Sequence, residues 1–214
     1  MRYFFALIAL ALAQTGIAAH ATPPAMDWEI GPIIRGQNYS LNMPLAPMQT
    51  EGGWAFNFPN STKADGHVHY VTFDPGSLRN ASLIRVRYRV DARQGTRFVP
   101  QEDSHRPGTV SLFFQRRGDN WSARGRYALY RWYAPAHTVQ EIAPGIHEMT
   151  VRLDDPAWGS VVGGIKAGDR PRAFERSLAN ASRVGLVFGS TAARGHGVYA
   201  TAPARFELLD FEIR

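Results

Sequence analysis

Residues 82–90 read Ser-Leu-Ile-Arg-Val-Arg-Tyr-Arg-Val, so that Ile84, Val86 and Tyr88 alternate with three arginines. Successive side chains of a β-strand point to opposite faces of a sheet, and this alternation therefore predicts a strand with one apolar and one solvated face. Similar runs recur between turn-forming segments such as Asp-Pro-Gly at 74–76. They predict strands over residues 54–58, 67–73, 109–115, 126–133, 147–153, 183–188 and 204–213. Strands at this spacing are typical of two packed antiparallel sheets.

We therefore predict an all-β fold, a two-sheet antiparallel jelly-roll sandwich with one short helix. Pro171 near a first turn, with Phe174 and Leu178 four residues apart, predicts that helix over residues 171–180. Three prolines in residues 27–48 favour edge strands and loops there. Alternate apolar positions predict a core that contains Phe56, Val86, Tyr88, Leu112, Phe114, Leu129, Val151, Leu186 and Phe188.

The chain begins with a pattern typical of a cleaved export signal. Arg2 precedes an uncharged apolar run over residues 4–13, and residues 19–21 read Ala-His-Ala. We predict a signal peptide over residues 1–21, a single β-sandwich domain over residues 22–214, and a secreted protein of the periplasm or the extracellular space. An uncleaved N-terminal anchor is the alternative. No later segment approaches the roughly 20 apolar residues that a membrane-spanning helix needs.

Composition excludes some classes of function. The 214 residues include no cysteine, which excludes thiol catalysis, thiolate metal sites and disulfides. The formal net charge is +6, and only Lys63 and Lys166 of the 24 basic residues are lysines. Nucleic-acid binding would require clustered charge on one element, whereas the densest group alternates with apolar residues over 84–89. We interpret that group as a solvated strand face, with contact to an acidic glycan as the alternative.

Aromatic and planar polar side chains are concentrated in residues 115–133. In the strand predicted over 126–133, Tyr130 and Trp132 share one face, while Leu129 marks the other face as the core side. Tyr130, Trp132 and the preceding Trp121 would then form an outward aromatic surface that can stack on sugar rings. Arg117, Asp119 and Asn120 would supply hydrogen bonds to the hydroxyl groups. The alternative is that a loop or the helix covers Tyr130 and Trp132.

His67 and His69 lie two apart, a spacing that places both imidazoles on one strand face. Two such rings can chelate zinc or copper, but a third ligand would have to come from a distant histidine. We interpret the pair as hydrogen-bonded sheet histidines, with metal binding as the alternative. His196 lies between two glycines, in a loop where the backbone can approach a ligand closely.

The sequence selects no catalytic residues. Asp103, Asp119, Glu141, Glu148 and Asp154 supply carboxylates, but no spacing singles out a pair that would hydrolyse a glycoside. The chain contains no G-x-S-x-G turn, no P-loop and no dinucleotide-binding glycine motif.

Residues 183–189 (Arg-Val-Gly-Leu-Val-Phe-Gly), 195–200 and 204–213 resemble the closing strands of carbohydrate-binding-module-like jelly rolls. Together with residues 115–132, they also resemble exported bacterial proteins of no assigned function. The resemblance implies non-catalytic binding of a polysaccharide or cell-envelope glycan and, in some members, a structural calcium ion. Asp210 would supply at most one of the six to eight oxygens that calcium needs, and otherwise no cofactor is expected. A polysaccharide-degrading hydrolase or lyase, or a structural envelope protein, is the alternative function. We expect no nucleic-acid partner and leave the oligomeric state open.

Overall fold

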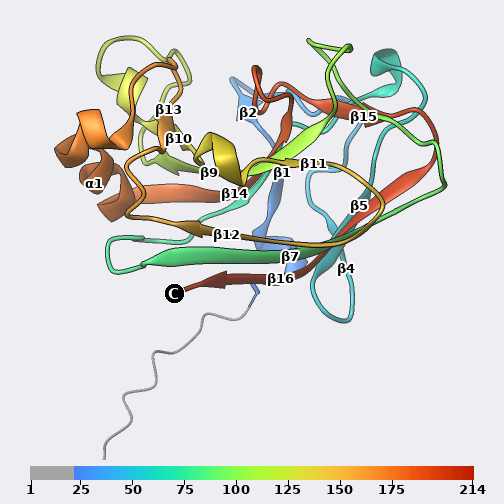
Figure 1. The fold of residues 1–214 in the computed structure, drawn as a ribbon, viewed down its shortest axis with the longest axis horizontal. Coiled ribbons are helices and arrows are strands. Elements are labelled where there is room, and N and C mark those ends of the chain that lie inside the picture. Colours follow the sequence, from blue (N-terminus) through green and yellow to red (C-terminus); the bar gives the residue numbers. More distant parts are fainter. Residues whose placement is uncertain (1–21) are drawn as a thin grey trace, which may run out of the picture.

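The computed structural model describes residues 22–214, so the predicted signal peptide lies outside the described residues. Two main antiparallel sheets pack against each other, and helix α1 (Pro171–Ala179) lies across one end of them (Figure 1). The all-β sandwich with one short helix that the sequence predicts is thereby confirmed.

The larger sheet has seven strands in the order β1-β6-β14-β9-β10-β13, with β11 paired to β9 beside this path. Its strands are β1 (Glu29–Gly31), β6 (Tyr70–Phe73), β14 (Ala181–Gly189), β9 (Thr109–Arg116), β10 (Arg131–Tyr133), β13 (Gly159–Ser160) and β11 (Gln140–Glu141).

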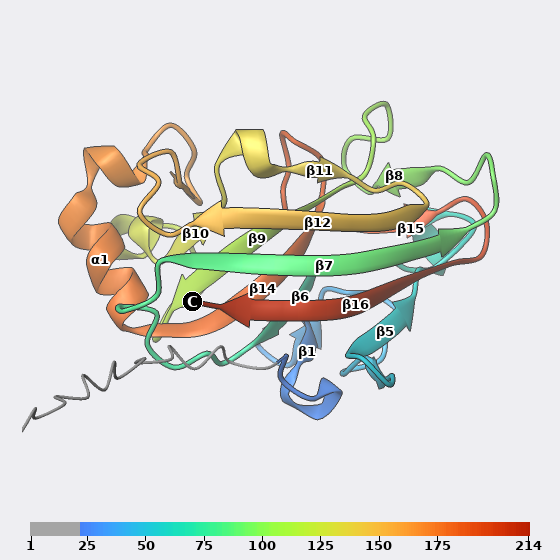
Figure 2. The same cartoon turned by 60° about the horizontal axis from the view of Figure 1, so that its bottom comes forward.

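The smaller sheet has the order β12-β7-β16-β5-β4, and its three long strands run side by side in Figure 2. Its strands are β12 (Gly145–Arg152), β7 (Leu83–Ala92), β16 (Ala204–Ile213), β5 (Trp54–Asn57) and β4 (Met48–Gln49). The remaining short elements are β2 (Ile33–Ile34) paired with β3 (Gln37–Asn38), β8 (Phe98–Pro100) paired with β15 (Val198–Ala200), and the 3-10 helices η1 (Ala25–Asp27), η2 (Lys63–Asp65), η3 (Gly125–Leu129), η4 (Ala136–Thr138) and η5 (Ala167–Asp169).

Strand β7 has the two faces that its alternation predicts. Tyr88 is buried and its ring stacks on Phe206 of β16 at a centroid distance of 4.9 Å. On the opposite face, Arg89 pairs with Glu207 at 2.5 Å and Arg85 lies 3.6 Å from Glu148 of β12. The arginines of β7 therefore lie on a solvated face, where carboxylates of neighbouring strands partner Arg85 and Arg89.

The predicted core is confirmed in all but one position. The buried residues are Phe56, Val86, Tyr88, Leu112, Phe114, Val151, Leu186 and Phe188, each at most 1% exposed. Leu129 is only half-buried, packed against the edge of this core.

Most predicted strand boundaries agree with the structure to within three residues, but the strand predicted over residues 126–133 is wrong. Residues 125–129 form η3, and the strand begins only at Arg131. Positive φ values occur at Gly118, Trp121 and Ala123 before η3 and at Gly125, its first residue. These left-handed residues bend the chain out of the sheet and interrupt the two-residue periodicity.

The larger sheet is buried on both faces. The smaller sheet covers its inner face, whereas loops cover an outer cluster formed by Tyr70, Phe113, Tyr133 and Val187. Trp121 and Val161 pack onto that cluster from two of these loops. The outer face is therefore a second, smaller core.

Gly185 in the middle of β14 allows β6 to approach closely. Its φ is +155°, and a Cβ at this position would overlap the carbonyl oxygen of Val71. We expect Gly185→Ala to lower the free energy of unfolding by at least about 3 kcal/mol, because neighbouring backbone has no room to move. Gly76→Ala, where a Cβ meets nothing within 4 Å, is the matched control and should cost only about 1 kcal/mol. Urea denaturation of both variants measures the difference, and similar losses would contradict this explanation.

Candidate functional site

A buried ion pair anchors the loop between β9 and η3 to the outer face of the larger sheet. Arg131 Nε lies 2.9 Å from Asp119 Oδ2, and the Asp119 side chain is fully buried. The contact is a close ion pair rather than an aligned hydrogen bond. Gln115 of β9 donates a 2.8 Å hydrogen bond from Nε2 to the same carboxylate oxygen. Asp119, which the sequence analysis predicts as a sugar ligand, therefore has a buried carboxylate that holds the loop in this arrangement.

Trp121 lies beside this ion pair and covers part of the outer face. Its carbonyl oxygen accepts a 3.0 Å hydrogen bond from Arg131 Nη2, and the guanidinium carbon lies 4.9 Å from the centre of its ring. The ring also packs edge-on against Tyr70 at 5.6 Å. One face of Trp121 is thus occupied by protein, and the side chain is half-buried.

Trp132 is fully buried, so its predicted place on an outward aromatic surface is wrong. Its indole packs edge-on against Phe174 of α1 at 5.0 Å, and Nε1 donates a 3.0 Å hydrogen bond to the Leu129 carbonyl oxygen. The helix that covers this ring is the alternative that the sequence left open. The face assignment failed because it extended a strand periodicity through η3, where the chain is not extended.

Tyr130 instead belongs to a row of alternating cations and rings that we call the arginine–tyrosine ladder, formed by Arg126, Tyr127, Tyr130 and Arg116. The Arg126 guanidinium carbon lies 4.9 Å from the Tyr127 ring centre, and that of Arg116 lies 4.5 Å from the Tyr130 ring centre. The two tyrosine rings meet edge-on at 5.1 Å. Arg126 is exposed, and the other three residues are half-buried.

Helix α1 and strand β9 hold the ladder in place. Ser177 Oγ donates a 3.0 Å hydrogen bond to the Leu129 carbonyl oxygen. The Arg116 backbone N–H donates a 2.7 Å hydrogen bond to the Tyr130 carbonyl oxygen. Sequence reasoning overlooked Arg116, Arg126 and Tyr127 as site residues. Their signal in the sequence is the presence of four arginines within residues 116–126, beside the aromatic residues of the same segment.

The other two predicted site residues are exposed but already partnered. Arg117 Nη2 lies 2.9 Å from Asp74 Oδ2, and Asn120 Oδ1 accepts hydrogen bonds from the Ser122 backbone N–H and hydroxyl group. The structure therefore does not bring the predicted site residues together at one place. Asp119 and Trp121 lie on the outer face of the sheet, whereas Tyr130 lies on the ladder and Arg117 lies beside Asp74.

Charge in this segment is strongly one-sided. Residues 116–126 contain four arginines and a single acidic residue, Asp119. Asp119 is buried against Arg131, so no carboxylate within the segment neutralises these four arginines. Among the described residues, only Arg117 of the four has a carboxylate partner elsewhere, namely Asp74. This contrasts with the outer face of β7, where the arginines alternate with carboxylates.

The predicted histidine pair forms a buried hydrogen-bonded unit. His69 Nδ1 lies 2.9 Å from the Gly195 carbonyl oxygen, and His69 Nε2 lies 2.7 Å from His67 Nδ1. Because a carbonyl only accepts, His69 Nδ1 carries the proton and His67 Nδ1 donates to His69 Nε2. Burial, followed by the neighbouring His67, lowers the pKa of His69 from 6.5 to about 4, and burial also lowers that of His67. Both rings are therefore neutral at pH 7.

The glycine loop predicted to approach a ligand instead approaches this unit. A Cβ at Gly195 would overlap the Tyr70 ring, and one at Gly197 would overlap the His69 ring. His196 points to Glu102, with Nδ1 2.9 Å from Oε1. Among residues 22–214, no three His, Asp or Glu side chains gather closely enough to hold a metal ion.

Two tyrosines complete the outer cluster. The hydroxyl groups of Tyr70 and Tyr133 lie 2.7 Å apart, and burial raises the pKa of both. Both residues are less than 10% exposed beneath the loops. These hydroxyl groups are thus neutral, paired with each other and covered.

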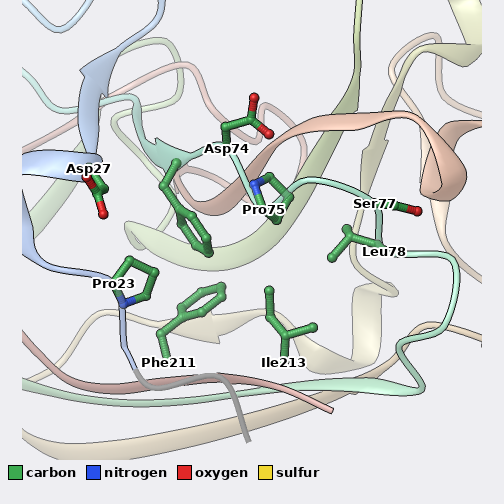
Figure 3. Close-up of a pocket in the computed structure, with 9 residues that line it drawn as sticks. Pro23, Asp27, Asp74, Pro75, Ser77, Leu78, Phe211 and Ile213 are labelled. Carbon is green, nitrogen blue, oxygen red and sulfur yellow. The ribbon is translucent and has the colours of Figure 1, made fainter. Parts of the chain in front are cut away.

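A cavity of about 420 Å³ opens between the two sheets near the start of the described chain. Figure 3 shows Pro23, Pro75, Leu78, Phe211 and Ile213 facing it, while the carboxylate of Asp74 points away from the apolar walls. Its lining also includes Asp27, Asp74 and Ser77, and none of the predicted site residues lines it.

Trp132 should be a stability residue rather than a ligand contact. We expect Trp132→Ala to lower the free energy of unfolding by about 3–5 kcal/mol, because it leaves a large cavity beneath α1. Tyr130→Ala, which removes a half-buried ring, should cost only about 1 kcal/mol. Urea denaturation followed by circular dichroism compares the two, and equal losses would show that Trp132 is not the more deeply packed ring.

The histidine unit predicts a pH-dependent stability. Since the folded-state pKa of His69 lies near 4 and its ordinary value is 6.5, the unfolded chain binds more protons between these pH values. Stability should be complete above pH 6.5 and fall by about 3 kcal/mol as the pH drops to 4. Protonated His69 would place two N–H donors, on His69 and His67, against each other.

Urea denaturation at intervals between pH 4 and 7 tests this dependence. His69→Gln should have a clearly flatter stability profile, whereas His105→Gln, which changes an exposed histidine, should keep the parent's slope. An unchanged slope in His69→Gln would show that the pH dependence arises elsewhere.

Neither known family models nor curated protein sequences supply a relative of this chain. A scan of the chain against models of known protein families finds no match, and a search of curated protein sequences finds none. Within residues 22–214, no helix is long and apolar enough to cross a membrane. The resemblance to carbohydrate-binding modules is thus supported only at the level of the β-sandwich architecture.

Proposed function

We propose that this is an exported, non-catalytic carbohydrate-binding protein whose ligand is an anionic polysaccharide, bound by the segment from Arg116 to Tyr130. The observation that carries the proposal is the arginine–tyrosine ladder. It combines two guanidinium groups, each packed on an aromatic ring, with a segment whose single carboxylate is used in a buried ion pair.

The ladder suits anionic sugars for a geometric reason. A guanidinium that packs on a ring still has N–H groups along its edge, and these can donate in pairs to a carboxylate or a sulfate. The ring contact also reduces the rotational freedom that an arginine side chain loses on binding. Arg126 Nη2 donates a 2.9 Å hydrogen bond to the Tyr127 hydroxyl group, which further fixes its plane.

The outer cluster favours a binding role over a catalytic one. A general base or acid needs a polar atom within reach of the substrate. The hydroxyl groups of Tyr70 and Tyr133 point at each other, and both ring nitrogens of His69 are used in hydrogen bonds. These groups explain how the loops are held rather than how a glycan would be cleaved.

The binding test compares three polymers, a polyuronate, a sulfated glycan and a neutral glucan, by isothermal titration with the exported protein. We expect binding to the first two and little to the third, with affinity that falls as salt rises because the contacts are exposed charges. The double variant Arg116→Gln, Arg126→Gln should weaken binding roughly tenfold or more, since each contact is worth about 0.5–1 kcal/mol or more.

The matched control is Arg87→Gln combined with Arg152→Gln, two exposed arginines on the smaller sheet. This variant keeps the same net charge as the first, and it should bind like the parent. Equal losses in both double variants would indicate attraction to net charge alone and would overturn the ladder as the site. Release of reducing or unsaturated ends from the polymer would instead identify an enzyme.

A further inference from the structure

Strand β16 extends beyond its neighbour β5 and leaves part of one edge open. β5 pairs only with residues 205–208, whereas β16 continues to Ile213. The pairing with β5 ends at Leu208, whereas the pairing with β7 on the other side continues past a bulge between Leu208 and Asp210 as far as Ile213. Beyond Leu208, backbone N–H groups that face away from β7 need acceptors from outside the sheet.

Thr22 occupies this open edge. Its Oγ accepts a 2.7 Å hydrogen bond from the Phe211 backbone N–H and donates one of 3.2 Å to Asp210 Oδ1. The residues that follow are held as well, because the buried Trp28 donates a 3.1 Å hydrogen bond from Nε1 to the Pro23 carbonyl oxygen. In Figure 1 the described chain accordingly begins beside β16.

Thr22 is also the residue that follows the predicted cleavage site. We propose that signal peptidase cleavage after Ala21 creates an α-ammonium group on Thr22 that pairs with Asp210, so that export processing adds a charge interaction at the edge of β16 that Thr22 already occupies. In the cleavage step, water adds to the Ala21 carbonyl carbon and the C–N bond to Thr22 breaks. Ala21 leaves with a carboxylate, and the Thr22 nitrogen takes up protons to become the ammonium group.

Covalent geometry places the new charge near its partner. The nitrogen and Oγ of one threonine are at most about 4 Å apart, so the ammonium lies within about 7 Å of the Asp210 carboxylate. In the precursor the same nitrogen is an uncharged amide. Cleavage therefore adds a favourable charge interaction as well as removing the leader.

The charged side chains around Asp210 do not prevent it from pairing with the α-ammonium group of Thr22. Arg85 of β7 approaches the other carboxylate oxygen at 3.9 Å, and it also lies 3.6 Å from Glu148 of β12. At the end of β16, Arg214 pairs with Glu212 at 2.7 Å. The arginines stay charged at every relevant pH, whereas the α-ammonium titrates near 8.

The experiment exports the full chain from a bacterial host and determines the intact mass of the processed protein. We expect a chain that begins at Thr22. Its α-amino group is then acetylated near pH 6.5, where Lys63 and Lys166 remain protonated and unreactive. Acetylation should lower the melting temperature of the parent by about 1–3 °C, as expected for a partly exposed ion pair in a chain of this size.

Two variants separate the pair from other effects of acetylation. In Asp210→Asn the acetylation should cause no such decrease, whereas Asp91→Asn, which changes an exposed carboxylate in the same sheet, should behave like the parent. A terminus other than Thr22, or an equal decrease in parent and Asp210→Asn, would overturn the proposal. If Asp210→Asn does not fold, the rate of acetylation of the parent is measured as a function of pH, which gives the pKa of its α-amino group. A pKa no higher than that of the α-amino group in a free Thr-Pro-Pro peptide would also overturn the proposal.

Discussion

The ion pair between Arg131 and Asp119 determines which side of the segment between β9 and β10 meets solvent. A buried charge without a partner costs several kcal/mol, so the pair fixes the loop on the outer face once it has formed. Trp121 is then held over Tyr70, and η3 brings the tyrosines of the ladder to the surface. The same constraint directs Trp132 inward, beneath α1.

Charge is distributed unevenly because of this arrangement. On the smaller sheet, Arg85 and Arg89 face carboxylates on neighbouring strands, and that surface is close to neutral. On the larger sheet, the one acidic residue of the loop is buried and the exposed arginines have few partners. Among the described residues, the segment from Arg116 to Tyr130 therefore combines arginines that have no carboxylate partner with half-buried tyrosine rings.

The fold was largely predictable, since the alternation in β7 and β16 reports burial directly and the helix over 171–179 is signalled by Pro171. The candidate site was only partly predictable. The aromatic and arginine content of residues 115–133 pointed to the segment that carries the candidate site, but not to the face that each side chain occupies. Positive φ values at Trp121 and Ala123 have no sequence signature, because neither residue type favours that conformation. The partner of Asp119 likewise depends on a contact across a loop.

We propose that anionic sugars bind the ladder while the outer cluster stays closed. A crystal structure of the protein with a bound oligouronate tests it most directly. We predict carboxylates of the sugar against the guanidinium groups of Arg116 and Arg126, with Trp121 still packed on Tyr70. An oligosaccharide seated on Tyr70 and Tyr133, with Trp121 displaced, would contradict the account and place the site on the outer face of the sheet.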